Sequence, residues 1–322
     1  MAKVCVIGGS GFIGRHIAEQ LVREDHSVLV PTRYRETAKR DLIPLPTVDV
    51  VEADVHDGEM LERLFAGCDA VINLVGILQG GKPASPYSDA FRRAHVELPT
   101  KIVGACRRAG VRRLVHMSGL HAGKDAPSEY LRSKADGEAA VMSVRNELAV
   151  TIFRPSVVFG PEDQFLNVFA ALQKRLPVVV LACPDAKFQP VYVEDVAAAF
   201  VRSLDAEESF GRAYDLVGPK VYTLRELVQY AGRVSGHPRP VIGLSDRMSY
   251  WQARMMEWVP GDLMSRDNYY SMQLPSTSDA KLPFGIVATP LEAVAPSYLG
   301  GATRDARYSA MRLGAGRGAR GS

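Results

Sequence analysis

The residues best suited to chemistry are a tyrosine and a lysine four positions apart, Tyr130 and Lys134, in a segment that is expected to be helical (residues 129–144). Side chains with this spacing project from one face of a helix, so the phenol and the ammonium would lie together. We expect the ammonium to lower the pKa of the Tyr130 phenol and to bind ribose hydroxyl groups. Tyr130 would exchange a proton with a carbonyl or an alcohol, and Ser118, which ends a predicted strand, would orient that oxygen. The three side chains therefore predict hydride chemistry at a carbon–oxygen bond.

Spacing alone gives this interpretation weak support. The chain contains 12 tyrosines, and about 0.4 pairs with this spacing are expected by chance. The position of the pair, after a strand that ends in serine, strengthens the hypothesis, and an ordinary exposed helix face is the alternative. His116 and His121 flank Ser118 and could relay a proton, although a histidine held in a structural hydrogen bond is the commoner case.

A strand, three spaced glycines and a helix open the chain and predict a dinucleotide site. The apolar run Val4–Ile7 is typical of a buried parallel strand, and Arg15–Arg23 has a helical pattern. Gly8 allows a sharp turn, and Gly11 lets backbone N–H groups approach a pyrophosphate at the helix N-terminus. Gly14 would let the helix pack close to the sheet, and a plain glycine-rich turn is the alternative. The residues expected to contact the cofactor here are Gly8, Ser10, Gly11, Phe12, Ile13 and Gly14.

The end of the second predicted strand bears on the choice between NAD(H) and NADP(H). An NAD site usually places Asp or Glu about 20 residues after the first turn, where the carboxylate holds the ribose 2′-hydroxyl. Here residues 31–35 read PTRYR, and no acid comes before Glu36. A guanidinium can bind a 2′-phosphate through paired charge-assisted hydrogen bonds. We therefore expect NADP(H) to be favoured over NAD(H), with Arg33 on the phosphate and Thr32 donating a hydroxyl. A solvated Arg33 is the alternative.

Two further strand ends predict contacts with the nucleotide. Asp54 and Val55 follow the third strand, where the carboxylate would accept a hydrogen bond from the adenine amine and the valine would pack on the ring. Asp54 could equally cap the next helix. Val75 and Gly76 end the fourth strand, and Gly76 would let the adenosine ribose approach closely. A simple strand-end glycine is the alternative there.

Strand and helix patterns alternate along most of the chain, which predicts an α/β fold with a Rossmann-like, doubly wound parallel sheet. Strands are expected at 4–7, 28–30, 48–52, 70–75, 113–117, 150–154, 178–183 and 190–193. Helices are expected at 15–23, 59–65, 89–108, 129–144, 165–173, 195–204 and 224–234, and Thr223 is expected to cap the last of them. The alternation loosens after residue 161. We expect an NAD(P)-binding domain in 1–165, rejoined by about 189–222, and a small C-terminal substrate lobe from 166–188 and 223–300.

Composition narrows the classes of partner and compartment. Lys and Arg number 39 and Asp and Glu 36, a balance too even to indicate a nucleic-acid partner. The four cysteines are scattered and predict buried thiols in a reducing compartment, with neither a metal site nor disulfides. No apolar run approaches the ~18 residues of a membrane span, and a strand from about Lys3 leaves no room for a leader, so we expect a cytoplasmic protein. The basic tail, 301–322, is expected to be disordered, and a basic arm that contacts a partner or an anionic surface is the alternative.

Four large apolar residues recur at helical spacing in the predicted lobe and include both tryptophans of the chain; they are Met248, Trp251, Met255 and Trp258. A helix packed inside the lobe is the simplest interpretation. Two sharper interpretations are an apolar wall of the substrate pocket and a surface that docks onto a membrane-bound partner. Of these two we favour the pocket wall, because an exposed stripe would invite association.

These motifs together resemble the short-chain dehydrogenase/reductase superfamily, in its extended or atypical branch of NAD-dependent epimerase/dehydratase-like proteins. Besides the glycine loop, Ser118, Tyr130 and Lys134, the resemblance rests on segments 154–156 (RPS), 159–161 (FGP) and 191–196 (VYVEDV). More narrowly, segments 95–99, 128–138, 154–167, 188–193 and 290–299 resemble the group that includes the nucleotide-binding accessory subunit of respiratory complex I and its bacterial relatives. The resemblance implies that Pro155, Ser156 and Val157 lie along the nicotinamide, with a backbone N–H holding its carboxamide.

One feature departs from the superfamily pattern. Extended-branch epimerases that act on sugar nucleotides usually carry a basic residue before the segment at 191–196, where it clamps a substrate phosphate, and here Gln189 and Pro190 occupy that place. The loop 119–123 (GLHAG) is also more apolar than a sugar site requires. Both features argue against a nucleotide-sugar substrate.

Three functions are compatible with the sequence. The first is an NADP(H)-dependent oxidoreductase that transfers a hydride to or from an apolar carbonyl or alcohol, which the set of Ser118, Tyr130 and Lys134 favours. The second is an accessory subunit or assembly factor of respiratory complex I that binds NADPH without turnover, peripheral on the inner face of a membrane, which the narrower resemblance favours. The third is a sensor of the nucleotide ratio that regulates a partner.

Overall fold

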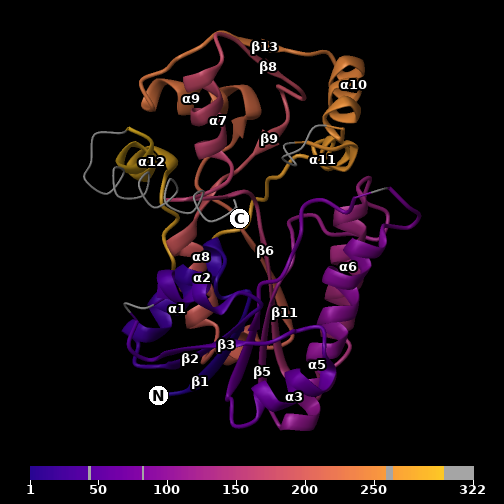
Figure 1. Cartoon of the computed structure of the whole chain (residues 1–322), viewed down its shortest axis with the longest axis vertical. Helices are drawn as coiled ribbons and strands as arrows, with labels where there is room; N and C mark the ends of the chain where they lie inside the picture. Colours follow the sequence, from indigo (N-terminus) through magenta and orange to yellow (C-terminus); the bar gives the residue numbers. More distant parts are fainter. Residues whose placement is uncertain (43–44, 82, 259–263, 301–322) are drawn as a thin grey trace.

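A computed structural model of the chain describes residues 1–42, 45–81, 83–258 and 264–300. Its centre is a sheet of seven parallel strands in the order β11-β6-β5-β4-β1-β2-β3 (Figure 1). The strands are β1 (Lys3–Ile7), β2 (Ser27–Thr32), β3 (Val48–Glu52), β4 (Ala70–Asn73), β5 (Arg113–Met117), β6 (Ala149–Pro155) and β11 (Arg212–Leu216). Strand order reverses between β1 and β4, so the sheet is doubly wound and the predicted Rossmann-like fold is confirmed.

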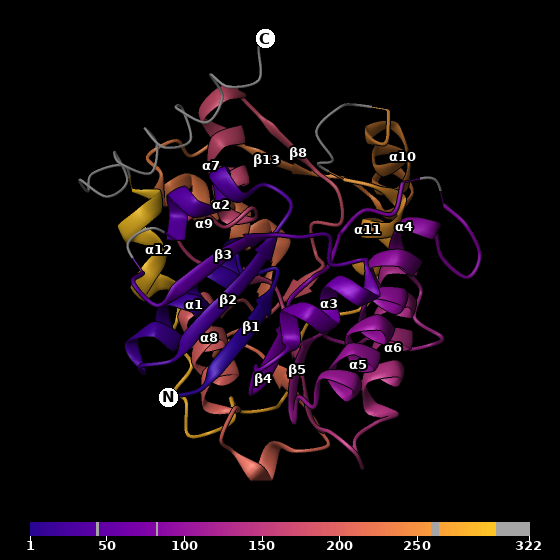
Figure 2. The same cartoon turned by 60° about the horizontal axis from the view of Figure 1, so that its bottom comes forward.

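Helices cover both faces of the sheet (Figure 2). One face packs against α1 (Phe12–Arg23), α2 (Arg35–Leu42) and α8 (Val193–Arg202), and the other packs against α3 (Gly58–Phe65), α5 (Leu98–Ala109) and α6 (Glu129–Met142). Strand β1 shows why its sequence is apolar throughout. Val4 and Val6 enter the core beneath α1, while Cys5 and Ile7 enter the core beneath α3 and α5. A strand that is buried on both faces needs an apolar residue at every position.

The helical run predicted at 89–108 is interrupted in the structure. It begins as α4 (Asp89–Phe91), continues as a π-helical segment, η1 (Arg92–Glu97), and becomes α5. Segment η1 approaches α6 closely because Gly137 has no side chain, and a Cβ atom there would collide with the carbonyl oxygen of His95. π-Helical turns commonly occur at functional sites, and this one places the His95 ring against the ring of Tyr130.

The remaining helices and most of the short strands form a separate body, which we call the C-terminal lobe. They are α7 (Leu166–Arg175), β8 (Val179–Leu181), β9 (Lys187–Phe188), β12 (Tyr222–Thr223), α9 (Leu224–Val234), β13 (Val241–Gly243), α10 (Asp246–Met256), α11 (Arg266–Ser271) and α12 (Leu291–Leu299). Two small apolar clusters, one containing Leu227 and the other Val228, hold the lobe together. As predicted, Thr223 caps α9, and it does so in a capping box with Glu226.

The elements that the sequence did not predict are short or half-exposed. Strand β11 lies at the edge of the sheet and pairs with β6 alone, so its sequence, RAYDL, lacks a continuous apolar run. Helices α2, α11 and α12 were also not predicted, nor were β7 (Val158–Phe159), β9, β12 and β13. Strands of two or three residues are too short to show a periodic pattern.

Helix α10 contradicts the prediction of a packed lobe helix. The predicted wall of the substrate pocket is also wrong, because none of the four stripe residues lines the cavity beside Tyr130 and Lys134, although Trp258 lines a separate cavity between the lobe and the loop around Gly80. Each residue of the apolar stripe is more than half exposed; the exposed fractions are 55% for Met248, 51% for Trp251, 69% for Met255 and 87% for Trp258. Smaller residues, Ser249 and Ala253, take the buried positions of the helix. The small residues therefore lie on the inner side of α10, and the large apolar residues lie on its outer side.

Three more expectations can be compared with the structure. Cys5, Cys68 and Cys106 are buried free thiols, as predicted, and Cys183 is half-buried. Among the residues described, no helix combines the length and the apolar character needed to cross a membrane. The predicted basic tail, residues 301–322, lies outside the described residues.

Candidate functional site

The glycine loop forms a tight turn at the carboxyl end of β1. Gly8 has a φ of 84°, in the region that favours glycine, and the Gly11 N–H donates to the Gly8 carbonyl oxygen at 3.0 Å. A Cβ atom on Gly14 would collide with the backbone of Gly8 and Gly9. Gly14 is therefore needed for the close approach of α1 to the turn that directly follows β1. The N-terminus of α1, at Phe12, begins at this turn.

The structure brings the three predicted catalytic side chains to the same edge of the sheet. Tyr130 and Lys134 lie on the side of α6 that faces the end of β5. The Lys134 ammonium donates to the Met117 carbonyl oxygen at 3.2 Å, immediately before Ser118 in the chain. A Cβ atom on Gly119 would lie 3.0 Å from the Tyr130 hydroxyl oxygen, so the phenol ends beside the residue that follows Ser118.

Ser118 is almost fully buried, and its hydroxyl oxygen has no hydrogen-bond partner among the described residues. Leaving a buried hydroxyl unpaired costs about 1–3 kcal/mol, so a buried hydroxyl in a folded protein normally has a partner, which can be a water or a bound molecule. The oxygen of a bound molecule in the adjoining cavity could supply the missing partner.

Burial changes the acid–base properties of the pair in a direction that the sequence did not predict. The pKa of Tyr130 is raised to about 12, first by burial and then by the Asp267 carboxylate. Burial lowers the pKa of Lys134 to about 8, although the Glu138 carboxylate acts in the opposite direction. The expectation that Lys134 lowers the pKa of Tyr130 is therefore wrong for this structure, because burial and a nearby carboxylate both favour the neutral phenol.

His95, on η1, belongs to this site although the sequence analysis assigned it no role. Its Nε2 accepts the Ile77 N–H at 3.0 Å, so Nδ1 carries the proton and donates to the Ser133 hydroxyl at 2.8 Å. That hydroxyl in turn donates to the Tyr130 carbonyl oxygen. Burial, and then the Lys134 ammonium, lower the pKa of His95 to about 2. The neutral ring therefore fastens η1 to the helix that carries the predicted catalytic pair.

The two histidines that flank the predicted catalytic serine have structural partners. His116 is buried, its Nδ1 accepts a hydrogen bond from the Asn73 amide at 3.0 Å, and burial lowers its pKa to about 3. His121 is exposed, and its Nε2 lies 2.9 Å from the Thr277 carbonyl oxygen. A histidine that stays neutral down to about pH 3 is a poor proton relay, so the structural interpretation is favoured for His116.

A cavity of about 480 Å³ adjoins these side chains and has a mostly apolar wall. Predicted site residues in the wall are Phe12, Ile13, Gly76, Ser118, Tyr130, Lys134, Pro155, Ser156 and Val157. The lobe contributes Phe188, Met272 and Leu274 to the other side. Gln189, which replaces the phosphate-clamping basic residue of sugar-nucleotide epimerases, instead donates its side-chain amide to the Gly218 carbonyl oxygen.

Arg33 lines a second hollow, of about 410 Å³, together with Asp54, His56 and Arg93. Asp54 accepts a hydrogen bond from the His56 N–H, and Asp57 is the residue that caps α3, so the alternative in which Asp54 caps that helix is wrong. Arg93 comes from η1, far along the chain, and nothing in the local sequence indicated it. The predicted residues that line neither space are Gly8, Ser10, Gly11, Gly14, Thr32, Val55 and Val75.

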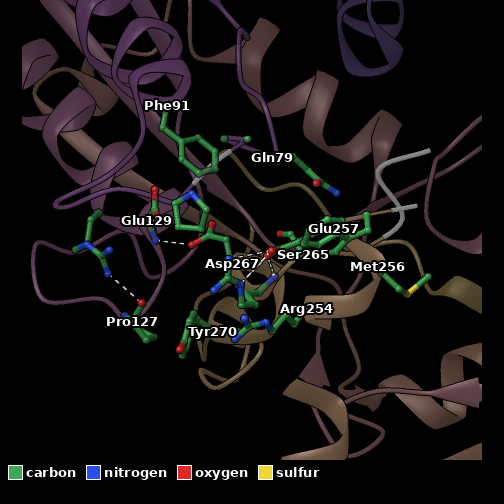
Figure 3. A pocket seen from close by; sticks show the side chains of 16 residues that line it. Gln79, Phe91, Pro127, Glu129, Arg254, Met256, Glu257, Ser265, Asp267 and Tyr270 are labelled. Carbon is green, nitrogen blue, oxygen red and sulfur yellow. Dashed lines mark hydrogen bonds and ion pairs between the residues drawn. The ribbon is translucent and has the colours of Figure 1, made fainter. Parts of the chain in front are cut away.

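Helix α11 of the lobe contacts the predicted catalytic helix through Asp267. The Asp267 carboxylate accepts the N–H groups of Glu129 and Tyr130 at 2.6 and 3.1 Å. The Glu129 carboxylate accepts the N–H groups of Ala84 and Ser88, in the loop before α4. Figure 3 shows Asp267 and Glu129 in the wall of a third cavity, of about 800 Å³, between that loop and the lobe. The lobe thus positions α6 and raises the pKa of its tyrosine.

His16, Glu19 and Glu194 bring three possible metal-ligand atoms within 4.8 Å of one another. The Glu194 carboxylate accepts a hydrogen bond from Gln20 at 2.7 Å and lies 2.6 Å from His16 Nδ1, while Glu19 pairs with Arg23. These bonds fasten α1 to α8, and they give the cluster a structural role.

Comparison with known proteins identifies relatives of two kinds. Two relatives are named NADH dehydrogenase (ubiquinone) 1 alpha subcomplex subunit 9, mitochondrial: the Arabidopsis thaliana protein is 35% identical over 70% of this chain, and the Mus musculus protein is 31% identical over 89%. The matches span 56% of the first relative and 77% of the second, so this chain covers little more than half the length of the plant protein. A 2-alkyl-3-oxoalkanoate reductase of Stenotrophomonas maltophilia is 28% identical over 77% of this chain and 80% of its own length.

A solved structure resembles the fold of this chain, and a family model identifies its family. The structure of DesIV, a dTDP-glucose 4,6-dehydratase from Streptomyces venezuelae with NAD bound, has a TM-score of 0.66 and 22% identity over 77% of this chain and 85% of that chain. A likeness at this identity shows the fold and nothing of the substrate. The model of the NAD dependent epimerase/dehydratase family matches residues 4–216, more than half of the chain. The chain therefore belongs to the NAD dependent epimerase/dehydratase family.

Proposed function

We propose that the protein is an NADP(H)-dependent oxidoreductase that transfers a hydride to or from an apolar carbonyl or alcohol substrate. The observation that carries the proposal is the arrangement of Ser118, Tyr130 and Lys134 around one apolar cavity. Titratable groups with strongly shifted pKa values in a cavity are typical of catalytic sites. The relative that is named as a 2-alkyl-3-oxoalkanoate reductase supports the same class of reaction.

The residues at the carboxyl edge of the sheet fit a dinucleotide. The turn at Gly8 and Gly11 leaves the N-terminus of α1 available to a pyrophosphate. Gly76 leaves room for the Lys134 ammonium group beside the end of β4, because a Cβ atom there would lie 2.9 Å from its nitrogen. A bound nicotinamide would supply or accept the hydride. We assign nucleotide binding to residues 1–165 with 189–222, and the facing substrate wall to the lobe segments within 166–188 and 223–300.

The segment after β6 offers one suitable donor to a carboxamide. Pro155 has no N–H, and the Ser156 N–H already donates to the Leu216 carbonyl oxygen at 3.0 Å. This leaves the Val157 N–H for the carboxamide contact that the superfamily resemblance implies.

The charges around the second hollow support NADP(H). Arg33 and Arg93 bring two guanidinium groups to it, while Asp54 is available for the adenine amine. Two guanidinium groups suit a 2′-phosphate, whereas a 2′-hydroxyl would leave both without a charged partner.

In the reducing direction, the substrate carbon gains the hydride and its oxygen gains a proton. Tyr130 keeps its proton at neutral pH because its pKa is near 12, and it would donate this proton as negative charge develops on the oxygen. Lys134, with a pKa near 8, is mostly charged at pH 7 and would stabilise the phenolate that Tyr130 becomes. Ser118, whose hydroxyl has no partner in the described part of the chain, would donate to the same substrate oxygen.

The first prediction concerns Tyr130→Phe, which removes the proton donor and keeps the ring. Turnover of apolar ketones and secondary alcohols, followed by NADPH absorbance, should fall at least about 100-fold. Binding of NADPH should remain nearly unchanged, whereas Lys134→Ala should weaken both binding and turnover. Tyr270→Phe, on α11 and 40% exposed, is the matched control and should retain activity. Undiminished turnover in Tyr130→Phe would rule out the catalytic role.

The second prediction concerns the choice of cofactor. The native protein should bind NADPH at least about tenfold more tightly than NADH, a difference of about 1.4 kcal/mol. Arg33→Asp should remove or invert this difference, because a carboxylate repels the 2′-phosphate. Isothermal titration with both nucleotides measures it, and Arg63→Asp, an exposed arginine on α3, is the control. Equal affinities in the native protein would refute the role given to Arg33.

A second function, an NADPH-binding accessory subunit or assembly factor of respiratory complex I, is supported by the two mitochondrial subunit relatives. In that case the protein would lie peripherally on the inner, cytoplasmic face of a membrane. Extraction in mild detergent, followed by identification of co-purifying proteins and of the bound nucleotide, separates the two functions. Recovery with subunits of a respiratory complex would favour the accessory role, and recovery alone with turnover would favour the enzyme.

A further inference from the structure

Helix α10 has the reverse of the usual pattern of a surface helix. Its fully buried residues are the small Ser249 and Ala253, whereas the large residues of the apolar stripe face solvent. Spacings of three and four residues keep each set on its own side of the helix, and the two sides are opposite. A surface helix normally turns its large apolar residues inward, so the outer side of α10 is an apolar face without a partner in the chain as described.

The exposed apolar surface continues from α10 onto the neighbouring two-stranded sheet. Val180 on β8 and Ile242 on β13 are register partners and are 49% and 54% exposed. The Gln252 side chain joins α10 to this sheet by donating to the Val180 carbonyl oxygen at 3.2 Å. These elements lie together at the end of the molecule away from β1 (Figure 1). We call the apolar stripe together with Val180 and Ile242 the distal face.

Basic side chains border the distal face. Arg254 lies over the Trp251 ring at 5.5 Å, and a shallow hollow of about 250 Å³ is lined by these two residues with Met255 and Trp258. Arg247 lies one residue before the stripe begins. Neither Arg247 nor Arg254 forms an ion pair with any residue that the structure describes. Two further exposed cations, Lys174 and Arg175, end α7 just before β8.

The acidic residues of α10 and its C-terminal end already have partners. Asp246 accepts a hydrogen bond from the Tyr269 hydroxyl at 2.8 Å. Glu257 forms an ion pair with Arg266 at 2.9 Å. Burial raises the pKa of the Glu257 carboxylate, but Arg266 and, to a smaller extent, Arg254 attract it and lower that pKa. The basic side chains Arg247, Arg254, Lys174 and Arg175 nevertheless outnumber Asp246 and Glu257, so the distal face combines a large apolar area with a positively charged border.

We propose that the distal face docks onto a membrane surface that contains anionic lipids. Tryptophan and arginine have an apolar body and a polar end, which suits the headgroup region, while the methionine, valine and isoleucine side chains suit the boundary with the acyl chains. Basic residues at the border are attracted to a negatively charged leaflet. The proposal goes beyond the oxidoreductase function, because it does not require turnover, and it names the surface by which the second function would attach the protein to a membrane.

Intrinsic fluorescence can test the proposal without a label, because both tryptophans of the chain lie on the distal face. The full-length protein is mixed with phosphatidylcholine vesicles that contain roughly 30% phosphatidylglycerol. We expect tryptophan emission to shift to shorter wavelength, brominated lipids to quench it, and the protein to float with the vesicles. Binding should be at least about tenfold weaker with phosphatidylcholine alone or at high salt.

Two double variants examine the apolar and the charged parts of the face. Trp251→Ser with Met255→Ser, and separately Arg247→Gln with Arg254→Gln, should each weaken vesicle binding at least about tenfold. Val287→Ser removes a side chain that is 86% exposed outside the distal face, and it should bind as the native protein does. Binding of NADPH, measured on every variant, shows that the nucleotide-binding part stays folded.

Three results would overturn the proposal. Absence of binding between the native protein and anionic vesicles would mean that the face serves a protein partner. Binding that leaves the tryptophans unquenched, or that both double variants preserve, would assign attachment to another part of the chain, such as the basic residues 301–322. An equal loss of binding in Val287→Ser would show that the effect is not specific to the distal face.

Discussion

Helices α6 and α10 both carry their most distinctive side chains three or four residues apart, yet the structure turns those side chains in opposite directions. On α6, Tyr130 and Lys134 face the end of β5 and line the apolar cavity, and Lys134 is almost fully buried. On α10, Trp251 and Met255 face solvent. The same periodicity therefore accompanies the proposed catalytic arrangement in one helix and an outer surface in the other.

The neighbours of the two helices explain the difference. Helix α6 lies against η1, where Gly137 leaves room for the His95 carbonyl group, and Asp267 of the lobe holds its first turn. Helix α10 packs through small residues, and the Ser249 hydroxyl accepts the Cys183 N–H at 3.0 Å. Helical spacing thus predicts which residues share a face, while the packing of other elements decides which way that face points.

The close packing of α6 can be disrupted with one methyl group. Gly137→Ala should lower the free energy of unfolding by about 3 kcal/mol, the upper end for overpacking, because the obstacle is backbone and not a flexible side chain. Urea unfolding measures the change. Gly58→Ala is the matched control, since a Cβ atom there meets nothing within 4 Å, and it should be neutral or slightly stabilising. Equal effects of the two substitutions would contradict the close approach of α6 and η1.

Acid should destabilise the packing beneath α6 through His116. Its pKa is lowered from 6.5 to about 3, so below pH 6.5 the unfolded chain binds a proton that the folded chain does not. Stability is therefore lost as the pH falls, by about 2 kcal/mol between pH 7 and pH 5. Urea unfolding at both pH values should show that the native protein loses about 2 kcal/mol more than His116→Gln. Equal losses of stability in the two proteins would show that His116 is not held neutral in the fold. His121→Gln is the control, because it removes an exposed histidine.

The smallest effect is expected on the outer side of α10. Trp251→Ser or Met255→Ser should change the free energy of unfolding by less than about 1 kcal/mol, because these side chains keep more than half of their surface in water in the folded state. Leu227→Ala, in the core of the same lobe, should cost about 2–5 kcal/mol. Thermal unfolding of the three variants measures these changes in stability. A large loss of stability in Trp251→Ser would show that the stripe packs against the protein, so that α10, like α6, turns its distinctive side chains inward.

The parts of the fold that the sequence predicted well depend on neighbours in the chain. Strand β1 has an apolar residue at each position that meets a core, and Thr223 caps α9 through a residue three positions away. Strand β11 could not be predicted in this way, because an edge strand with one partner has half-exposed positions and a mixed sequence. The π-helical segment η1 was hidden for a related reason, since its register depends on how closely Gly137 of α6 lets it approach.

By itself, the sequence determined that a dinucleotide turn follows β1 and that Ser118, Tyr130 and Lys134 come together, because strand ends and helix faces follow from spacing along the chain. Only the tertiary structure decided the raised pKa of Tyr130, the hollow that Arg33 shares with Arg93, and the outward direction of α10. The physical reason is that electrostatics and burial depend on groups from distant parts of the chain, such as Asp267 beside Tyr130, which packing alone brings near.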